Sequence, residues 1–491
     1  MNELLTHKEY KAIAKTMDIP KTAFIDGKNR PGKGKKLKTR NPATGDLIAT
    51  IASCNKQDVD LAVKKANEAF YQGIWAKKDP QDRKEILIKF CKLITRNRRE
   101  LAVIESLESG KPIFDCEQID LPETISTIKW HAESIDKIYD QAGPTNENAL
   151  SLIVREPIGV VAAILPWNFP LLMLAWKIGP ALASGCSIIV KPAEQTSISA
   201  LKLANLASEA GIPNGVFQVL PGDGKSVGEP LALHEKVDMI SFTGSTETGK
   251  KILKYSAQSN LKKVVLECGG KNPAIVFADA ENLDTVAEHI VTGAFWNMGE
   301  NCSAISRLIV NKKVKKQLLE KIRFRLRDWK TGDPLDPKNR LGALIDSDHC
   351  KKVKSYIDKK IPDGPFISPL IIEVLKKDKR AKDEIFGPIL SVIEVNNDDE
   401  AIAIANETPY GLTASIFTSS NRKAIRTARE LKAGTVTINC YGEGDITTPF
   451  GGYKQSGFGG RDNGLHAHEQ YTETKTIWID LNDPLEGDNI G

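Results

Sequence analysis

Apolar and polar positions along the chain repeat with two different periods, which predicts an alternation of strands and helices. From Ile158 to about Val310, short runs rich in Val and Ile predict buried strands. These runs are Gly159–Ile164, Ser187–Val190, Val216–Val219, Met239–Phe242, Lys263–Leu266, Ala274–Phe277 and Arg307–Val310. Helical periodicity lies between them at Leu171–Ser184, Thr196–Ala210, Thr246–Ser256 and Leu283–Met298. Continuous apolar strands separated by helices are typical of a parallel sheet with helices on both faces.

A second alternating block follows toward the C-terminus. Its predicted elements are Leu390–Val395, Asp398–Asn406, Ala414–Phe417, Arg422–Leu431 and Thr435–Asn439. Helical segments at Gln57–Phe70 and Asp79–Ser109 precede the first block. The Pro-broken region Pro362–Pro369 and a strand at Thr474–Leu481 are expected at the periphery. The chain is therefore predicted to be an α/β protein with two α/β units.

Length and charge narrow the class of protein. A chain of 491 residues is too long for one core, and 41% apolar with 27% charged residues is typical of globular proteins. The net charge is only +5. The densest basic run, Lys33–Lys38, carries no aromatic residues between its lysines, so a nucleic-acid partner is not expected.

Eight irregularly spaced cysteines form no metal-binding pattern, and they favour reduced thiols in a cytoplasmic protein without a metal. The first eight residues lack the apolar core of a signal peptide. The uncharged segment Pro157–Trp176 is about as long as a membrane span. Pro166, Asn168 and Pro170 in its middle instead predict a buried strand, a turn and a helix, so no membrane partner is expected.

Two motifs indicate a dinucleotide site. Ser241–Gly249 runs from a predicted strand into a predicted helix through Gly244 and Ser245, where backbone N–H groups and a hydroxyl can hold an anion. An ordinary helix cap explains this motif equally well. Gly222-Asp223-Gly224 with Gly228 is only a weak imitation of the G-x-G-x-x-G fingerprint.

Lys191 and Glu194 follow the neighbouring strand, where a doubly wound fold places a carboxylate that accepts hydrogen bonds from the adenosine ribose. Two solvated charges would be the ordinary explanation if this motif stood alone. Glu194 would repel a 2′-phosphate, which favours NAD over NADP, although Lys191 and Lys225 offset part of that repulsion.

Cys302, Glu267 and Asn168 are the candidate catalytic residues. A thiol can add to a carbonyl, and a carboxylate can activate water to release the adduct. The oxyanion formed by thiol attack needs donors, which Asn168 and the backbone N–H of Cys302 can supply. Each residue alone has an ordinary explanation: a small core cysteine, a surface glutamate and an asparagine in a turn.

These motifs together resemble the NAD(P)-dependent aldehyde dehydrogenase superfamily over about residues 22–480. The motifs are Pro166–Pro170, Lys191–Glu194, Phe242–Ser245, Glu267–Lys271, Cys302 and Glu384–Pro388. The resemblance implies that Cys302 is the nucleophile, Glu267 the general base and Asn168 the oxyanion donor. The cofactor residues it implies are Ile164, Pro166, Trp167, Lys191, Glu194, Gly224, Gly228, Phe242, Thr243, Gly244, Ser245, Glu384 and Phe386.

The resemblance also implies a domain organisation. Residues 1–138 and 156–266 are expected to form a Rossmann-like NAD-binding domain, and residues 267–455 a catalytic domain. Residues 139–155 and 470–485 are expected to form the strands of an oligomerisation arm, so a homodimer or homotetramer is predicted.

Three further segments are similar to the bacterial gamma-glutamylaminobutyraldehyde dehydrogenases of putrescine breakdown. They are Lys129–Tyr139, Gly444–Gly457 and Leu465–Trp478. A substrate tunnel for an extended aliphatic aldehyde is expected, in which Asp445 and aromatic faces attract an amine or amide end. Its predicted residues are Met173, Trp176, Trp296, Asp445 and Phe450.

The sequence departs from the superfamily pattern at three places. Ile305 replaces a usual Gly and is expected to narrow the space near Cys302 or stiffen its turn. Glu300 replaces a common Gln and is expected to raise the pKa of the thiol or to relay protons. The segment Lys360–Leu370 is shortened, which is interpreted as a trimmed surface excursion that could alter subunit contacts.

The predicted activity is oxidation of an aldehyde to a carboxylate with NAD, with NADP as the alternative cofactor. Two alternatives remain open from the sequence. One is a CoA-acylating enzyme, against which Glu267 argues because thioester hydrolysis would compete with transfer. The other is a binding or scaffold protein that has lost its chemistry, for which Ile305 is the one argument.

Overall fold

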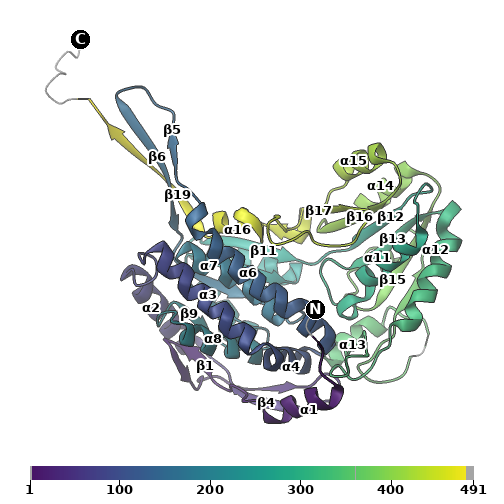
Figure 1. The fold of residues 1–491 in the computed structure, drawn as a ribbon, viewed down its shortest axis with the longest axis horizontal. Coiled ribbons are helices and arrows are strands. Elements are labelled where there is room, and N and C mark those ends of the chain that lie inside the picture. The colour runs from purple at the N-terminus through teal and green to yellow at the C-terminus, as the bar shows by residue number, and fades with distance from the viewer. Residues whose placement is uncertain (1–2, 360, 483–491) are drawn as a thin grey trace.

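Two sheets and a projecting arm organise the computed structural model, which describes residues 3–359 and 361–482 (Figure 1). The first sheet has the strand order β18-β11-β10-β7-β8-β9-β1-β2 and the second β14-β15-β13-β12-β16-β17. A three-stranded sheet with the order β19-β6-β5 forms the arm, which extends away from the body (Figure 1). The predicted α/β architecture is confirmed.

The centre of the first sheet is parallel. Its strands are β7 (Val160–Ile164), β8 (Ser187–Lys191), β9 (Phe217–Val219), β10 (Met239–Gly244) and β11 (Lys263–Cys268). The chain adds β8 and β9 on one side of β7 and then returns to add β10 and β11 on the other. This reversal creates a crevice at the carboxyl ends of β7 and β10, where doubly wound sheets bind their ligands.

Both faces of this sheet are buried, as the apolar runs predicted. Val161 and Val190 belong to one apolar core, and Ala162 and Ile189 belong to another on the opposite face. Helices of this region include α2 (Lys56–Tyr71), α7 (Pro170–Ser184), α8 (Ile198–Ala210), α9 (Glu229–Leu233) and α10 (Thr246–Gln258). The segment Pro157–Trp176 contains a strand, a turn and the start of a helix, as predicted. None of the described helices is both long and apolar enough to cross a bilayer.

The second sheet is parallel throughout. Its strands are β12 (Asn272–Val276), β13 (Ile305–Asn311), β14 (Leu370–Glu373), β15 (Ile389–Val395), β16 (Thr413–Phe417) and β17 (Thr435–Ile438). The helices among these strands are α11 (Leu283–Phe295), α12 (Lys312–Arg325), α13 (Ser347–Lys354), α14 (Asp398–Asn406) and α15 (Asn421–Glu430). The second predicted block of strands and helices is therefore confirmed.

Two predicted helical segments differ from the helices in the structure. Asp79–Ser109 is two helices, α3 (Pro80–Arg96) and α4 (Arg98–Ser109), separated at Asn97. The helix predicted over Leu283–Met298 ends at Phe295, because Asn297 and Met298 adopt φ angles of 51° and 57°. L-residues cannot continue a right-handed helix at such angles. This early end turns the chain toward Cys302.

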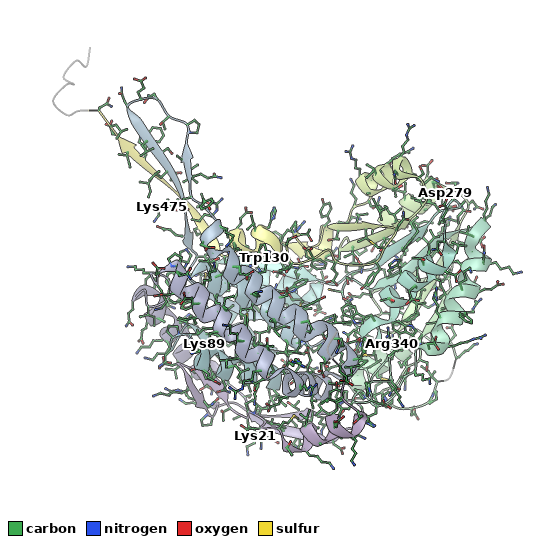
Figure 2. All side chains as sticks on the ribbon, in the orientation of Figure 1. Lys21, Lys89, Trp130, Asp279, Arg340 and Lys475 are labelled. Atoms are coloured by element: carbon green, nitrogen blue, oxygen red, sulfur yellow. The ribbon has the colours of Figure 1, made fainter. Side chains whose placement is uncertain are left out.

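The N-terminal and connecting elements were mostly not predicted. They comprise α1 (His7–Thr16), β1 (Ala23–Ile25), β2 (Lys28–Arg30), β3 (Lys36–Arg40), β4 (Leu47–Ala52), α5 (Ile113–Asp115), α6 (Leu121–Ser134), β18 (Gly457–Phe458) and α16 (Gly464–Gln470). The exposed lysines Lys21, Lys89 and Lys475 lie on widely separated parts of the surface (Figure 2). Their spread agrees with the scattered basic residues of the sequence.

The arm pairs strands from distant parts of the chain. β19 (Thr472–Asp480) runs antiparallel to β6 (Ala149–Pro157), and β5 (Gln141–Gly143) pairs with the other edge of β6. The predicted strands at Ser151–Arg155 and Thr474–Leu481 are present. Trp478, with 64% of its surface exposed, leaves an apolar face of the arm uncovered within this chain. Residues 483–485 of the predicted segment, and Lys360 of the shortened loop, lie outside the described residues.

Arg307 on β13 is a buried cation that ties three segments together. Its guanidinium donates to the carbonyls of Lys271 at 2.8 Å, Ile404 at 3.0 Å and Ala405 at 2.9 Å. Ile404 and Ala405 lie in the last turn of α14, where carbonyls lack helical partners and the helix dipole favours a positive charge. Arg307 thereby fixes α14 and the start of β12 against β13.

Replacing Arg307 should destabilise the fold. Arg307→Leu removes three hydrogen bonds to main-chain carbonyls, and the free energy of unfolding should fall by roughly 2–4 kcal/mol. Urea denaturation followed by circular dichroism measures this change. Arg422→Leu, at an exposed position, is the matched control and should change stability by less than about 0.5 kcal/mol. Equal effects of the two variants would contradict the structural role of Arg307.

Candidate active site

A cavity of about 230 Å³ lies where the carboxyl end of the first sheet meets loops of the second. It contains all three predicted catalytic residues and many of the predicted cofactor residues. The predicted catalytic, cofactor-binding and substrate-tunnel residues that line it are Pro166, Trp167, Asn168, Met173, Trp176, Thr243, Gly244, Ser245, Glu267, Cys302, Glu384, Phe386 and Phe450. Phe169, Cys268, Gly269, His349 and Lys352 complete the lining.

The register of the first sheet explains why distant residues meet here. Ile164 at the end of β7 is paired with Lys191 on one side and with Phe242 on the other. On the next pair of strands, Thr243 lies opposite Glu267. The carboxyl ends of parallel strands share one edge, so Thr243 and Glu267 at the ends of β10 and β11 reach the same cavity as Pro166 and Trp167 after β7.

Cys302 follows a strained turn that the sequence pattern did not reveal. The residues before it, Asn297, Met298 and Gly299, all have positive φ angles, which reverse the chain after α11. The carbonyl of Cys302 accepts a hydrogen bond of 2.7 Å from the Asn272 side chain. This bond fixes the backbone of the thiol residue against β12.

The electrostatic surroundings of Cys302 oppose ionisation. Burial raises the pKa of its thiol well above the usual range, and Glu443, Glu267 and Glu384 raise it further. A thiolate is the reactive form of cysteine. The thiol is therefore protonated at neutral pH unless a bound group changes this field.

Asn168 offers a hydrogen-bond donor to the same cavity. Its side-chain nitrogen donates at 2.9 Å to the carbonyl of Glu300, two residues before the thiol. An amide NH₂ group carries two hydrogens, so the second can serve a ligand oxygen. The Asn297 side chain donates to the carbonyls of both Asn168 and Glu300, which locks the two segments together.

Glu267 ends β11 and is 4% exposed. Burial raises the pKa of its carboxyl group well above the usual range, with a further rise from Asp462. Its Oε1 atom is buried without a hydrogen-bond partner, as expected of a group that serves a reactant. The neighbouring charges are neutralised, because Lys177 pairs with Asp462 at 2.6 Å with both side chains fully buried.

The cofactor end of the cavity lies at the N-terminus of α10. The Ser245 side chain accepts a hydrogen bond of 3.2 Å from Thr248 N, so it is a helix cap, as the alternative explanation held. Capping does not exclude ligand binding, because a hydroxyl can also donate. The hydroxyl of Thr243, two residues earlier at the end of β10, is buried without a partner. An unpartnered donor at a helix N-terminus fits a phosphate-bearing ligand.

Several predicted cofactor residues lie outside the cavity lining. Lys191 is nearly buried, and its ammonium donates to the Glu194 carboxylate at 2.9 Å. Gly228 approaches this lysine, since a Cβ there would stand 4.0 Å from its side chain. Gly224 begins a short turn in which the Asp223 carboxylate accepts from Ser226 N at 2.6 Å.

Glu384 and Phe386 come from the loop before β15. Glu384 accepts a hydrogen bond of 2.8 Å from Gly270 N. Phe386 adopts a φ of 60°, and its carbonyl accepts a hydrogen bond of 2.7 Å from His349. The Phe386 ring meets Trp167 edge-on at 5.5 Å. Phe386 is thus held in a conformation that costs energy for an L-residue, which is common at ligand sites.

The sequence interpretation missed His349 and Lys352. Both lie on α13, a short and strongly charged helix that carries no pattern typical of a ligand site. His349 contacts Trp167 and Phe386, and burial lowers its pKa. Lys352 lines the cavity beside Glu384, whose pKa it lowers against the effect of burial.

A second chamber of about 330 Å³ adjoins the first and shares Trp176 with it. Its lining includes two predicted tunnel residues, Trp296 and Asp445. The other residues around it are Glu123, Ser126, Thr127, Tyr441, Gly442, Glu443, Gly444, Ile446 and Asn463. The predicted tunnel residues therefore divide, with Met173 and Phe450 in the inner cavity and Trp296 and Asp445 in the outer chamber.

The two residues that depart from the superfamily pattern point away from the thiol. The Glu300 carboxylate accepts from Ile345 N at 3.2 Å and lies 3.4 Å from His349 Nε2. The hypothesis that Glu300 raises the pKa of the Cys302 thiol is not supported, because Glu300 is not among the groups that raise it. Ile305 is buried in the core between α11 and the second sheet and does not line the cavity.

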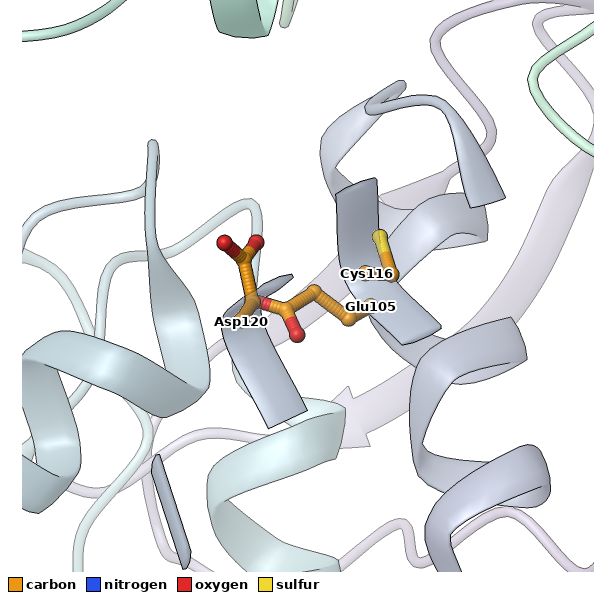
Figure 3. Close-up of side chains that lie close together, drawn as sticks. All are labelled: Glu105, Cys116 and Asp120. Carbon is orange, nitrogen blue, oxygen red and sulfur yellow. The ribbon is translucent and has the colours of Figure 1, made fainter. Parts of the chain in front are cut away.

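One buried cluster has the residue types of a metal site. Glu105, Cys116 and Asp120 bring their ligand atoms within 4.8 Å of one another (Figure 3). The Lys111 ammonium, itself fully buried, forms an ion pair with Asp120 and lies 3.7 Å from the Phe169 ring. Lys111 supplies the positive charge that these carboxylates require. The cluster is an internal ion pair beneath the cavity wall.

Comparison with known proteins identifies the family. Residues 30–477 match the Aldehyde dehydrogenase family. Aminoacetaldehyde dehydrogenase of Pseudomonas aeruginosa is 57% identical over 494 residues, which cover 98% of this chain and all of the relative. The NADP/NAD-dependent aldehyde dehydrogenase PuuC of Escherichia coli is 42% identical over 95% of this chain and 97% of its own.

A solved structure agrees with the sequence comparisons. The gamma-glutamyl-gamma-aminobutyraldehyde dehydrogenase of Burkholderia cenocepacia superposes with a TM-score of 0.95 and 44% identity. The superposition covers 97% of this chain and all of that structure. The fold described above is therefore one that known enzymes share. The chain belongs to the aldehyde dehydrogenase family.

Proposed function

We propose that the chain oxidises aldehydes with a terminal amino or amide-linked group to carboxylates, with NAD as the hydride acceptor. One observation carries this proposal: Cys302, Glu267 and Asn168 line the same small cavity. Covalent aldehyde oxidation needs a nucleophile, a base and an oxyanion donor around one carbon atom.

In the first step, Cys302 adds to the carbonyl carbon of the aldehyde. The oxygen becomes an oxyanion, for which the free hydrogen of Asn168 Nδ2 and the backbone N–H of Cys302 are the donors. The first hydrogen of the Asn168 amide is already directed to the Glu300 carbonyl, so the side chain is oriented before substrate arrives. Such preorganised donors need no rearrangement when charge develops.

NAD, when bound, accepts the hydride that leaves the substrate carbon. The unpartnered Thr243 hydroxyl and the N-terminus of α10 fit its phosphates, and Lys191 with Glu194 fit the adenosine ribose. Glu384 and Phe386 fit the nicotinamide end, because both line the cavity beside Cys302. Glu194 is partly exposed and disfavours a 2′-phosphate, whereas its pairing with Lys191 reduces that repulsion. We therefore propose NAD as the preferred cofactor and NADP as a weaker one.

In the last step, water releases the acyl group from the sulfur. Glu267 is the base that accepts the proton of this water. Its partnerless Oε1 atom supports this role, because nothing in the described chain occupies the acceptor. Because the pKa of the carboxyl group is raised, the deprotonated carboxylate is a stronger base than that of an ordinary glutamate.

The outer chamber supports aldehydes that carry an amine. Three carboxylates, Glu123, Glu443 and Asp445, line it together with the indole rings of Trp176 and Trp296. Carboxylates and tryptophan faces both attract an ammonium group. The named activities of the relatives on aminoacetaldehyde and on gamma-glutamyl-gamma-aminobutyraldehyde support the same class, which includes the aldehydes of polyamine breakdown.

Assembly and location belong to the same proposal. The exposed apolar residues of the arm, such as Trp478, support a homodimer or homotetramer that forms through the strands at 139–155 and 470–485. The presence of two sheets supports a division into an NAD-binding part (1–138 and 156–266) and a catalytic part (267–455). Eight free cysteines support a reducing compartment such as the cytoplasm.

Removal of the nucleophile should abolish oxidation. In Cys302→Ser, NADH formation should fall by at least about 10³-fold, because a serine hydroxyl ionises far less readily than a thiol and is a much weaker nucleophile. Isothermal titration should still detect NAD with a Kd within about threefold of the wild type. Substantial NADH formation by this variant would contradict a covalent route through Cys302.

Removal of the base should separate the two half-reactions. In Glu267→Gln, stopped-flow absorbance should show one equivalent of NADH formed in a burst, followed by turnover slowed by about 10²-fold or more. The wild type should produce acid and NADH in equal amounts without CoA. Loss of the burst would assign Glu267 another role, and a strict need for CoA would favour the acylating alternative.

The oxidation rate should rise with pH. Burial raises the pKa of both Cys302 and Glu267, and each must lose a proton to react, so both are inactive at low pH and become active as pH increases. Measurements of kcat/KM between pH 6 and pH 10 test this expectation. A rate that falls between pH 7 and pH 9 would contradict it.

A further inference from the structure

Glu443 occupies a special position between the outer chamber and the nucleophile. It lines the chamber, and its carboxylate accepts a hydrogen bond from the hydroxyl of Ser303, the residue after Cys302. The Tyr441 hydroxyl lies 3.3 Å from the same Ser303 oxygen and accepts a hydrogen bond of 3.0 Å from Asn301. One carboxylate therefore contacts both the chamber and the loop that carries the thiol.

The other two acids of the chamber are placed differently. Asp445 is exposed, and its carboxylate is already bonded to the backbone and hydroxyl of Thr447 at 2.7 and 2.6 Å. Glu123 is on α6 and is exposed. Of the three acids, Glu443 is the one whose carboxylate contacts the loop that carries Cys302.

A second feature of the chamber points to a bound donor. Asn463 lines it, is 6% exposed, and its Oδ1 atom is buried without a partner. A buried carbonyl oxygen normally accepts a hydrogen bond. No lysine or arginine is among the described residues that line the chamber, so its negative charge is not neutralised from within. The orphaned acceptor and the unbalanced carboxylates both suit a primary ammonium group with three donors.

We propose that Glu443 binds the ammonium group of the substrate in the outer chamber and that, through Ser303, it makes Cys302 respond to whether the chamber is filled. This inference rests on the proposed oxidation of amine-bearing aldehydes and assigns their recognition to one residue. Trp176 and Trp296 hold the aliphatic stem, and the Asn463 amide oxygen accepts from the ammonium.

The coupling follows from the charges that face Cys302. These are the carboxylates of Glu443, Glu267 and Glu384, of which Glu443 opposes ionisation of the thiol most. Groups that face Glu443 include Tyr441 on the same loop, Glu123 and the buried Asp120 from the α6 side, and Cys302 itself. Burial raises the pKa of Glu443 itself, and a substrate cation beside it favours the ionised carboxylate and cancels its charge. The thiolate therefore forms more readily when an amine-bearing substrate is in place.

The first experiment measures recognition. 3-Aminopropanal and butanal have nearly the same shape and differ in the charge of the terminal group. The wild-type ratio of kcat/KM for these two aldehydes should favour the amine, and Glu443→Gln should reduce the ratio by about tenfold or more. Most of that change should appear in kcat/KM for the amine, with butanal changed less than about threefold.

Asp445→Asn is the matched control, because it removes one negative charge from the rim of the same chamber. It should reduce the ratio by less than about threefold, since exposed charges are screened. Glu443→Asp, which keeps the charge, should recover part of the preference. Equal losses in the Gln and Asn variants would overturn the assignment to Glu443. Absence of oxidation of either aldehyde by the wild type would instead refute the proposed function.

The second experiment needs no turnover. Iodoacetamide alkylation of Cys302 is followed against pH in the full-length protein, with and without saturating propylammonium and with 1-propanol as the neutral control. Propylammonium should lower the pH midpoint by roughly half a unit, and the alcohol should not. The midpoint is diagnostic because simple blocking of the reagent lowers the maximum rate only.

In Glu443→Gln, the midpoint should already be lower than in the wild type, and propylammonium should not move it further. An unchanged wild-type midpoint with propylammonium would overturn the coupling to Cys302. A persistent shift in Glu443→Gln would overturn the role of Glu443. Intact circular dichroism and thermal melting of the variant exclude misfolding as the cause.

Discussion

The link between β11 and β12 is the constraint on which the rest of the molecule depends. Gly269 and Gly270 carry the chain from the first sheet to the second, and neither has room for a side chain. A Cβ at Gly269 would stand 2.2 Å from the Glu384 carboxylate, and one at Gly270 would stand 2.9 Å from the Cys302 carbonyl. The crossing therefore brings Glu267, Glu384 and Cys302 around a single point. Ser456 and Arg307 bind the carbonyls on either side of the crossing and hold it in place.

This geometry sets the electrostatics of the cavity. Burial raises the pKa of the thiol, of Glu267 and of Glu384, and these two carboxylates raise the pKa of the thiol further. Two buried aspartates that take no part in the reaction are paired with lysines: Lys177 pairs with Asp462, and Lys111 pairs with Asp120. What remains is a set of acids that favours the protonated thiol, and a bound cation would change this balance. A soft nucleophile beside a base is protected in this way from premature reaction.

The sequence predicted the parts of the molecule that have a period or a motif. The strand ends at Ile164, Lys191 and Glu267 could be placed because apolar runs mark parallel strands and because charged residues after such runs are informative. The turn before Cys302 could not be predicted, since Trp296 and Met298 continue the apolar pattern of α11 while the backbone reverses. No sequence pattern marked His349 either, because its contact is a hydrogen bond to the backbone carbonyl of a residue in a distant loop.

Glu443 was not predicted for a related reason, and the nearby Asp445 was predicted as the acidic tunnel residue instead. Both are acids in one glycine-rich loop, and sequence alone cannot tell a carboxylate that caps Thr447 from one that contacts Ser303. The distinction matters because the inner cavity is fixed by strand ends and crossing glycines, whereas the outer chamber is built from α6 and this loop. Trp176 lines both spaces and Glu443 reaches the Cys302 loop through Ser303, whereas Glu123, Asp445 and Ile446 line the outer chamber alone. Substrate selection can therefore diverge within the family while the chemistry at the thiol is retained, and Trp176, which lines both spaces, is where the two are joined.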